Sequence, residues 1–179
     1  VSTHGLHYFV HTIFPLLQRD KFNFNNKINN NIIFSEGRGG DIGILNLHNC
    51  LKHASIQSEK LGISLVTIKN PGKIGALRVY AEELIQNGKL LILLKNTASS
   101  QGSFYTKKAL VGTNPICFAF PDSNFIFDTS TSTVATNSIR LMKKQNQKHK
   151  NNIGFDDSGI KTNDPKKILS NNAYLSTFS

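Results

Sequence analysis

The sequence predicts an α/β domain in which a mixed sheet is flanked by helices. Short apolar segments of strand length alternate with segments whose apolar residues recur at helical spacing. Alternation of strands with helices of about a dozen residues is typical of the α/β class. The chain has 179 residues, 39% of them hydrophobic, so it is long enough to bury a core. We therefore expect a single domain over residues 1–179.

Three segments have apolar residues at the spacing of an amphipathic helix. These expected helices cover residues 6–17, 45–61 and 76–87. Pro15 kinks or ends the first helix, because proline lacks the N–H that a helix interior requires. Gly62 ends the second helix and Gly88 the third, since glycine readily takes the left-handed conformation that follows helix ends.

Short apolar runs are expected to form the strands. They lie at residues 32–34, 63–68, 90–94, 116–120 and 125–127. The sequence Asn70-Pro71-Gly72 closes the second run with strong turn chemistry. The run 90–94 is apolar throughout, which predicts a central strand covered on both faces. Beyond Arg140 the chain is polar and basic, and we expect Lys143, Lys144, Lys148 and Lys150 to lie on a solvated loop or helix face.

The net charge is +10 with a pI near 9.7, which suits an anionic partner and leaves a basic anion-binding module as one hypothesis. The lysines of residues 143–150 have no aromatic residues between them, and no nucleic-acid motif is present. No apolar run approaches the roughly 20 residues that a membrane span needs. The sequence therefore predicts neither a nucleic-acid partner nor a membrane partner.

Metal and disulfide sites are not predicted. Cys50 and Cys117 are far apart and lack metal-ligand spacing. His4, His7 and His11 fall on roughly one helical face, but no carboxylate lies near them to complete a metal site.

The glycine cluster at residues 37–43 follows an expected strand and precedes an expected helix. It lacks the dinucleotide-binding pattern G-x-G-x-x-G, because Ile42 stands where the third glycine belongs. No acidic residue closes a following strand about 20 residues later, as that fingerprint requires. The cluster is therefore predicted to be a turn.

Four short motifs follow one another along the chain. They are Thr3-His4-Gly5, residues 70–75 with Tyr80, Gly112-Thr113-Asn114-Pro115-Ile116, and Asp128-Thr129-Ser130-Thr131-Ser132 with Val134-Ala135. Their order resembles that of the malate/L-lactate dehydrogenase family, which is distinct from the Rossmann-fold malate and lactate dehydrogenases. The family also contains ureidoglycolate and sulfolactate dehydrogenases and diketogulonate reductase. Residues 154–159 and Asp164-Pro165 extend the resemblance.

The resemblance implies a nicotinamide-dependent oxidoreductase that interconverts a 2-oxoacid and a 2-hydroxyacid. NAD or NADP would be the cofactor, and the full-length enzyme would be a cytoplasmic homodimer. Family members are longer at both ends, so we expect this chain to be a fragment truncated at both ends, with part of its site missing.

Site residues follow by position in the motifs. The resemblance makes His4 the proton donor, supported by Thr3, and a histidine suits this step because its unperturbed pKa lies near neutrality. Substrate contacts fall on Thr113 and Asn114. The predicted cofactor-binding residues are Gly72, Lys73, Ile74, Gly75, Asp128, Thr129 and Ser130. Without the resemblance, residues 112–115 would be a turn before a strand and Asp128 a cap for the following helix.

Three departures from the family pattern cluster at the site. Tyr8 replaces a substrate-binding arginine, Lys73 replaces a histidine, and Tyr105-Thr106 replaces a glycine pair. Tyrosine cannot make the bidentate contact that arginine offers a carboxylate. A decayed paralogue that keeps the fold without turnover is therefore the alternative to an active reductase.

Overall fold

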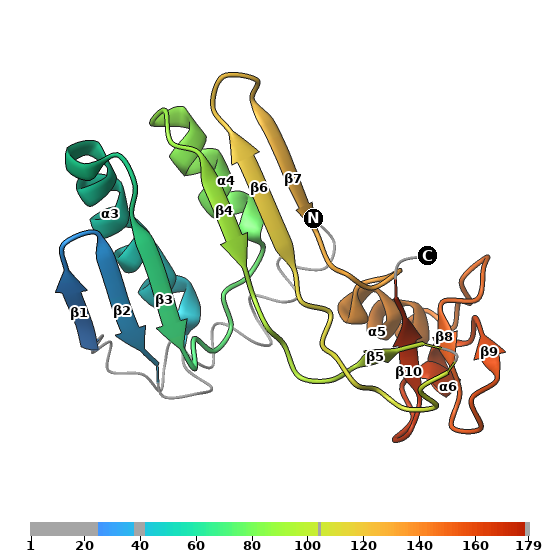
Figure 1. Cartoon of the computed structure of the whole chain (residues 1–179). Coiled ribbons are helices and arrows are strands. Elements are labelled where there is room, and N and C mark those ends of the chain that lie inside the picture. Colours follow the sequence, from blue (N-terminus) through green and yellow to red (C-terminus); the bar gives the residue numbers. More distant parts are fainter. Residues whose placement is uncertain (1–24, 38–41, 104, 178–179) are drawn as a thin grey trace. The chain divides into compact units, whose positions relative to one another are not determined.

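The computed structural model describes residues 25–37, 42–103 and 105–177. Strands and helices alternate through much of this length, so the predicted α/β class is confirmed (Figure 1). The chain divides into two compact units, one made of residues up to 90 with 120–124 and the other of residues 91–119 and 125–177. The expected helix over residues 6–17 lies outside the described residues.

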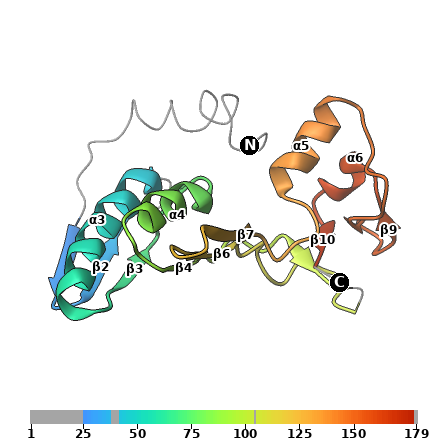
Figure 2. The same ribbon diagram turned by 90° about the horizontal axis from the view of Figure 1, so that it is seen from above.

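The first unit contains a three-stranded sheet in the order β1-β2-β3. Its strands are β1 (Asn25–Asn29), β2 (Ile32–Glu36) and β3 (Leu65–Lys69). β1 runs antiparallel to β2, and β2 runs parallel to β3. The parallel pair is joined by helix α3 (Gly43–Leu61), which lies over one face of the sheet (Figure 2). The predicted strand–helix–strand succession is thus confirmed.

The core of this unit forms between α3 and the sheet. Ile33, Cys50 and Ala54 are buried there, and Val66 and Ile68 pack against them. Burial raises the pKa of the Cys50 thiol, because a thiolate would lose its hydration there; a hydrogen bond with Ser35 acts in the opposite direction. A buried thiol of this kind is chemically inert.

Two predicted helix ends in this unit are confirmed. Gly62 has φ 81° and donates its N–H to the carbonyl oxygen of Ser58 at 2.9 Å, closing α3. Helix α4 (Leu77–Gln86) has Asn87 as its C-terminal cap residue, and Gly88 follows with φ 68°. Both glycines take the left-handed conformation that favours a residue without Cβ.

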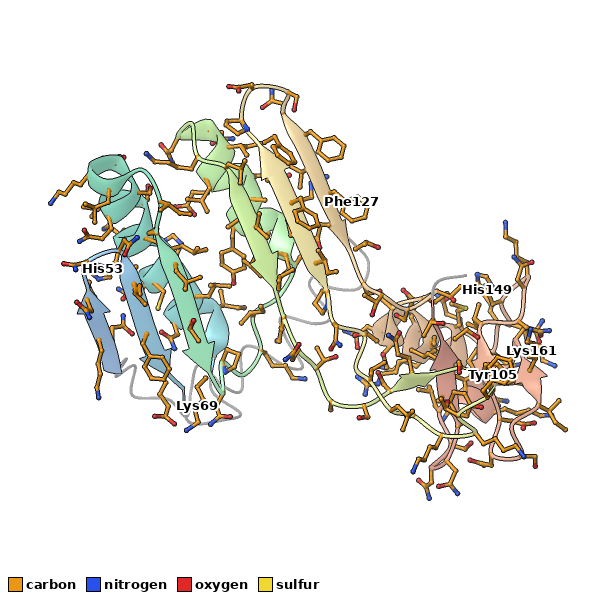
Figure 3. The ribbon with its side chains drawn as sticks, viewed as in Figure 1. His53, Lys69, Tyr105, Phe127, His149 and Lys161 are labelled. Carbon is orange, nitrogen blue, oxygen red and sulfur yellow. The ribbon has the colours of Figure 1, made fainter. Side chains whose placement is uncertain are left out.

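The second unit contains a sheet in the order β4-β6-β7. Its strands are β4 (Leu91–Leu94), β6 (Ile116–Phe120) and β7 (Phe125–Thr129). β4 runs antiparallel to β6, with Leu93 opposite Cys117 and Ile92 opposite Phe118. Phe127, labelled in Figure 3, has its ring 6.3 Å from that of Phe118.

The run 90–94 forms the predicted strand, but the expectation that both faces are covered is wrong. Among the described residues β4 is an edge strand, and burial alternates along it. Leu91 and Leu93 are buried, whereas Ile92 and Leu94 are more than half exposed. Side chains alternate between faces with period two, and a run that is apolar on both faces does not indicate which one is covered.

This alternation predicts opposite results for neighbouring leucines. Leu93→Ala should lower the free energy of unfolding by about 2–5 kcal/mol, because it empties space in a packed face. Leu94→Ala is the matched control, and it should change that free energy by less than about 0.5 kcal/mol because the side chain is 67% exposed. Urea unfolding of both variants measures the difference. Equal losses would contradict the assignment of the two faces.

A small four-stranded sheet completes the second unit, in the order β5-β10-β8-β9. Its strands are β5 (Gln101–Gly102), β10 (Tyr174–Ser176), β8 (Gly154–Phe155) and β9 (Lys161–Thr162). Two helices belong to the same region, α5 (Thr136–Lys144) and α6 (Pro165–Ile168), and they contact each other. Figure 2 shows them side by side.

The expected solvated face is confirmed at Lys143, Lys144, Lys148 and Lys150, which are exposed, but the surrounding polar region also contains a buried core that was not predicted. Ile139, Ile153, Ile168 and Leu175 form a buried cluster. They are isolated in a polar sequence, so no periodic pattern marks them. The lysines around them are exposed, as expected.

Asp164 organises the start of α6. Its Oδ1 accepts a hydrogen bond from the backbone N–H of Lys166 at 2.9 Å, which caps the helix. That bond, together with the nearby ammonium of Lys148, holds the pKa of Asp164 below its usual value.

Within the part of the chain that the structure describes, no helix combines the length and hydropathy that a membrane span needs.

Candidate active-site loops

The loop over residues 70–75 follows β3 and contains four of the predicted cofactor-binding residues. Gly72 and Gly75 have φ of 67° and 73°, which favours glycine at both positions. The carbonyl oxygen of Lys73 accepts a hydrogen bond from the N–H of Ile44 at 3.0 Å. The carbonyl oxygen of Ile74 accepts one from the hydroxyl of Tyr80 at 2.6 Å. The loop backbone is therefore held from both flanking helices, α3 and α4.

Two glycines allow neighbouring segments to approach this loop closely. A Cβ at Gly43 would overlap the carbonyl oxygen of Pro71, and a Cβ at Gly37 would overlap that of Asn70. Immediately before the loop, Lys69, labelled in Figure 3, forms an ion pair in which its Nζ is 2.8 Å from Glu36 Oε1. This ion pair joins the ends of β3 and β2. These contacts place the loop against the N-terminus of α3.

The 70–75 loop contains one lysine and lies next to the start of α3. The Lys73 side chain is exposed on the loop. The first turn of α3 contains no acidic residue, and no side chain caps its N-terminus. Helix N-termini attract negative charge, and an exposed ammonium beside one adds to the attraction.

The loop over residues 112–115 contains the predicted substrate-binding residues and leads into β6. Asn114 has φ 28°, and its Oδ1 accepts a hydrogen bond from the N–H of Thr97 at 2.9 Å. The hydroxyl oxygens of Thr113 and Thr97 are 3.4 Å apart. A Cβ at Gly112 would overlap the carbonyl oxygen of Thr97. Thr97 thus lies against three consecutive residues of this loop, Gly112, Thr113 and Asn114.

The predicted cofactor-binding residues Asp128, Thr129 and Ser130 lie at the end of β7 and just beyond it. The Oγ atoms of Ser130 and Ser132 are 3.1 Å apart, and Ser132 is buried. Asp128 is an exposed strand residue, and α5 begins at Thr136. The alternative that Asp128 caps that helix is therefore wrong.

Hydrogen bonds join Thr131, which lies just beyond β7, to the 112–115 loop. The N–H of Thr131 donates to the carbonyl oxygen of Thr113 at 2.8 Å, and the Thr131 hydroxyl donates to the same oxygen at 3.2 Å. Two motifs that are separate in the sequence, one predicted to bind substrate and one predicted to bind cofactor, are therefore adjacent in space.

Three substitutions at Asn114 separate its two roles. Asn114→Gly keeps the left-handed backbone but loses the acceptor for Thr97, whereas Asn114→Asp keeps the acceptor. Asn114→Ala loses both features and should cost the most, about 1–3 kcal/mol in the free energy of unfolding. Thermal denaturation of the three variants should give the order Asp, Gly, Ala from most to least stable. An alanine variant as stable as the aspartate variant would contradict these roles.

The remaining predicted residues are not brought together by the described structure. Thr3 and His4, together with the histidine group His4, His7 and His11, lie outside the described residues. The 70–75 loop belongs to one unit, and the 112–115 and 128–130 segments belong to the other. Among the described residues there is no group of three histidine, cysteine, aspartate or glutamate side chains able to hold a metal ion.

Two residues that support these loops have no recognisable signal in the sequence. Thr97 bonds to the 112–115 loop, and Gln101 Nε2 donates to Thr131 Oγ1 at 2.8 Å. Both lie in a polar stretch without periodicity, so nothing in the sequence distinguishes them from ordinary loop residues.

Comparison with known proteins identifies the family. The malate/L-lactate dehydrogenase family profile matches residues 1–178. A Delta(1)-pyrroline-2-carboxylate/Delta(1)-piperideine-2-carboxylate reductase from Pseudomonas putida is 30% identical over 122 residues, which are 66% of this chain and 36% of that protein. The L-sulfolactate dehydrogenase of Methanocaldococcus jannaschii is 26% identical over 134 residues, 73% of this chain and 39% of that protein.

Solved structures show the same fold. The crystal structure of malate dehydrogenase from Entamoeba histolytica matches with a TM-score of 0.85 at 22% identity, covering 98% of this chain and 52% of that one. A dehydrogenase from Sinorhizobium meliloti matches with a TM-score of 0.87 at 21% identity, covering 99% of this chain and 53% of that one. The chain thus spans about half the length of these structures and just over a third of the curated relatives. This chain belongs to the malate/L-lactate dehydrogenase family.

Proposed function

We propose that the protein containing this chain is an NAD(P)-dependent oxidoreductase that interconverts a 2-oxoacid and a 2-hydroxyacid. Family membership supports the class of reaction. The observation that supports the proposal is the pair of hydrogen bonds from Thr131 to the Thr113 carbonyl oxygen, because it joins the motif predicted to bind substrate to the motif predicted to bind cofactor. The proposed enzyme is a single-domain protein over this length, cytoplasmic, and a homodimer when full length.

The residues of the 70–75 loop fit a nicotinamide dinucleotide. Gly72, Lys73, Ile74 and Gly75 would hold it, with the Lys73 ammonium and the N-terminus of α3 attracting its phosphates. Asp128, Thr129 and Ser130 would hold it from the end of β7. The cofactor supplies the hydride for the reaction, and the protein supplies binding, orientation and the proton.

The chain's own residues then have three tasks in reduction. Thr113 and Asn114 bind the 2-oxoacid, and the hydrogen bonds between Thr97 and these two residues keep their loop in one conformation. His4, supported by Thr3, gives its proton to the carbonyl oxygen as the carbonyl carbon receives the hydride. One hydride and one proton are thus added, and the product is the 2-hydroxyacid. The reverse reaction requires His4 to accept that proton.

Nucleotide binding tests the proposal without requiring turnover. Titration of the full-length protein with NADH and with NADPH, followed by nicotinamide fluorescence, should show saturable binding of one or both. Lys73→Gln should raise the Kd roughly two- to fivefold, the effect of removing one exposed charge pair.

Lys60→Gln is the matched control for this titration. Lys60 lies in the last turn of α3, so its loss removes one exposed positive charge at the opposite end of the helix. We expect the Kd of this variant to equal that of the wild type. Saturable binding by neither nucleotide, or equal weakening by both substitutions, would contradict the proposed cofactor loop.

A further inference from the structure

Gln101 occupies a position between the two motif loops of the second unit. It is the first residue of the short strand β5 and is 2% exposed. Its N–H donates to the carbonyl oxygen of Val111 at 3.0 Å, and its own carbonyl oxygen accepts from the N–H of Val111 at 3.2 Å. Through its backbone, Gln101 therefore holds the residue that immediately precedes Gly112 and Thr113.

The side chain of Gln101 reaches the second loop. Its Nε2 donates to Thr131 Oγ1 at 2.8 Å, and the Thr131 hydroxyl in turn donates to the carbonyl oxygen of Thr113. The amide thus directs the Thr131 hydroxyl hydrogen toward Thr113, because the hydroxyl oxygen accepts from Gln101 and leaves its own hydrogen for the carbonyl. One side chain thereby connects both loops. Gln101 and Thr131 are 30 residues apart in the sequence.

A buried amide lowers stability at this position unless its polar atoms are hydrogen-bonded. Gln101 Oε1 is buried and accepts no hydrogen bond from any residue that the structure describes. A buried acceptor without a donor loses its hydration uncompensated, and an apolar side chain of the same length would avoid this cost. The amide therefore contributes the link to Thr131 through Nε2, whereas its Oε1 has no partner among the residues that the structure describes.

We propose that Gln101 is a positioning residue that holds the 112–115 loop against residues 129–131 and so sets the geometry of the substrate and cofactor motifs. The loops' binding roles rest on the proposed function, whereas the positioning itself rests only on the hydrogen bonds. Gln101 acts through Thr131 and Thr113 and makes no contact with the reacting atoms in this scheme.

Hydrogen exchange at the Thr131 amide is the direct test. Gln101→Leu in the full chain should speed this exchange roughly five- to tenfold, because the bond to the Thr113 carbonyl loses its support. The melting temperature should stay close to that of the wild type, since the substitution also removes the unsatisfied Oε1. Thr131→Val should speed amide hydrogen exchange in residues 112–115 by a similar factor. In the double variant, exchange should be no faster than in Thr131→Val alone.

Tyr174→Phe is the matched control. Tyr174 lies in the neighbouring strand β10, and its hydroxyl is also buried without a partner among the described residues. Removing it should leave exchange at Thr131 unchanged. If Gln101→Leu does not fold, Gln101→Met retains the length of the side chain but removes the N–H donor, and it should speed the same exchange. Unchanged exchange at Thr131 in a folded Gln101 variant would overturn the proposal.

The functional arm uses the full-length protein with a 2-oxoacid and NAD(P)H. We expect Gln101→Leu to raise the KM for the 2-oxoacid about tenfold with a smaller change in kcat, a pattern that a general loss of stability would not produce. Faster exchange with unchanged KM would overturn the link between Gln101 and the site. Absence of turnover in the wild type would overturn the proposed function and leave the exchange result to decide the positioning role.

Discussion

Replacing His4 by alanine in the complete protein should lower kcat by roughly 10²- to 10⁴-fold, the usual contribution of a general acid–base group. Proton delivery to the developing alkoxide would then depend on water, while the cofactor-binding residues would be unchanged. Affinity for the nicotinamide nucleotide should therefore stay nearly the same. Steady-state reduction of a panel of 2-oxoacids, with NADH and with NADPH, measures both quantities.

His7→Ala is the control for this experiment. It removes the same side chain three residues away, outside the Thr3-His4-Gly5 motif, and should leave kcat within about twofold, as expected of a group with no catalytic part. Equal turnover in the wild type and the His4 variant would exclude His4 from the mechanism. Turnover in neither would favour the decayed paralogue, in which Tyr8 in place of the family's arginine accounts for the loss of substrate binding.

Gly43→Ala should be one of the most damaging substitutions in the first unit. Its Cβ would overlap the carbonyl oxygen of Pro71 and lie 2.8 Å from Ile74 Cγ2, so α3 and the 70–75 loop would have to move apart. The hydrogen bond between Ile44 and Lys73 would be lost with that movement. We expect the free energy of unfolding to fall by about 1–3 kcal/mol or more, and the Kd for NAD(P)H to rise.

The sign of the effect makes this prediction decisive. In a helix with open space around it, glycine to alanine raises stability by about 1 kcal/mol. Gly62→Ala is the control: nothing lies within 4 Å of the added Cβ, and the cost arises only from φ 81°. It should destabilise the chain without changing nucleotide affinity. A Gly43→Ala variant as stable as the wild type would show that the loop is not packed against α3.

Several elements of the first unit could be predicted from local signals. α3 and α4 have amphipathic spacing and end before glycines, while β2 and β3 are short apolar runs bounded by turn residues. These signals act between residues that are close in sequence, so they survive without knowledge of the rest of the fold. Local signals were sufficient for the fold class, although β1 and the elements that follow β7 were not predicted.

The second unit shows where local signals are insufficient. β4 was expected to be covered on both faces, yet Leu94 is 67% exposed and Leu93 only 8%. Ile153, Ile168 and Leu175 lie in a basic, polar tail and still form a buried cluster. In both cases the contacts are made with residues distant in the sequence, and periodicity contains no information about such partners.

The sequence by itself determined the α/β class, the family motifs and their order, because these depend on residue type and spacing. Only the tertiary structure decided that the Thr113 carbonyl oxygen meets the Thr131 N–H, that Thr97 supports Asn114, and that Gln101 joins both loops. The physical reason is that a hydrogen bond requires two atoms at about 2.9 Å with suitable geometry. For residues 17 to 30 positions apart, that distance is set by how the strands and loops between them pack.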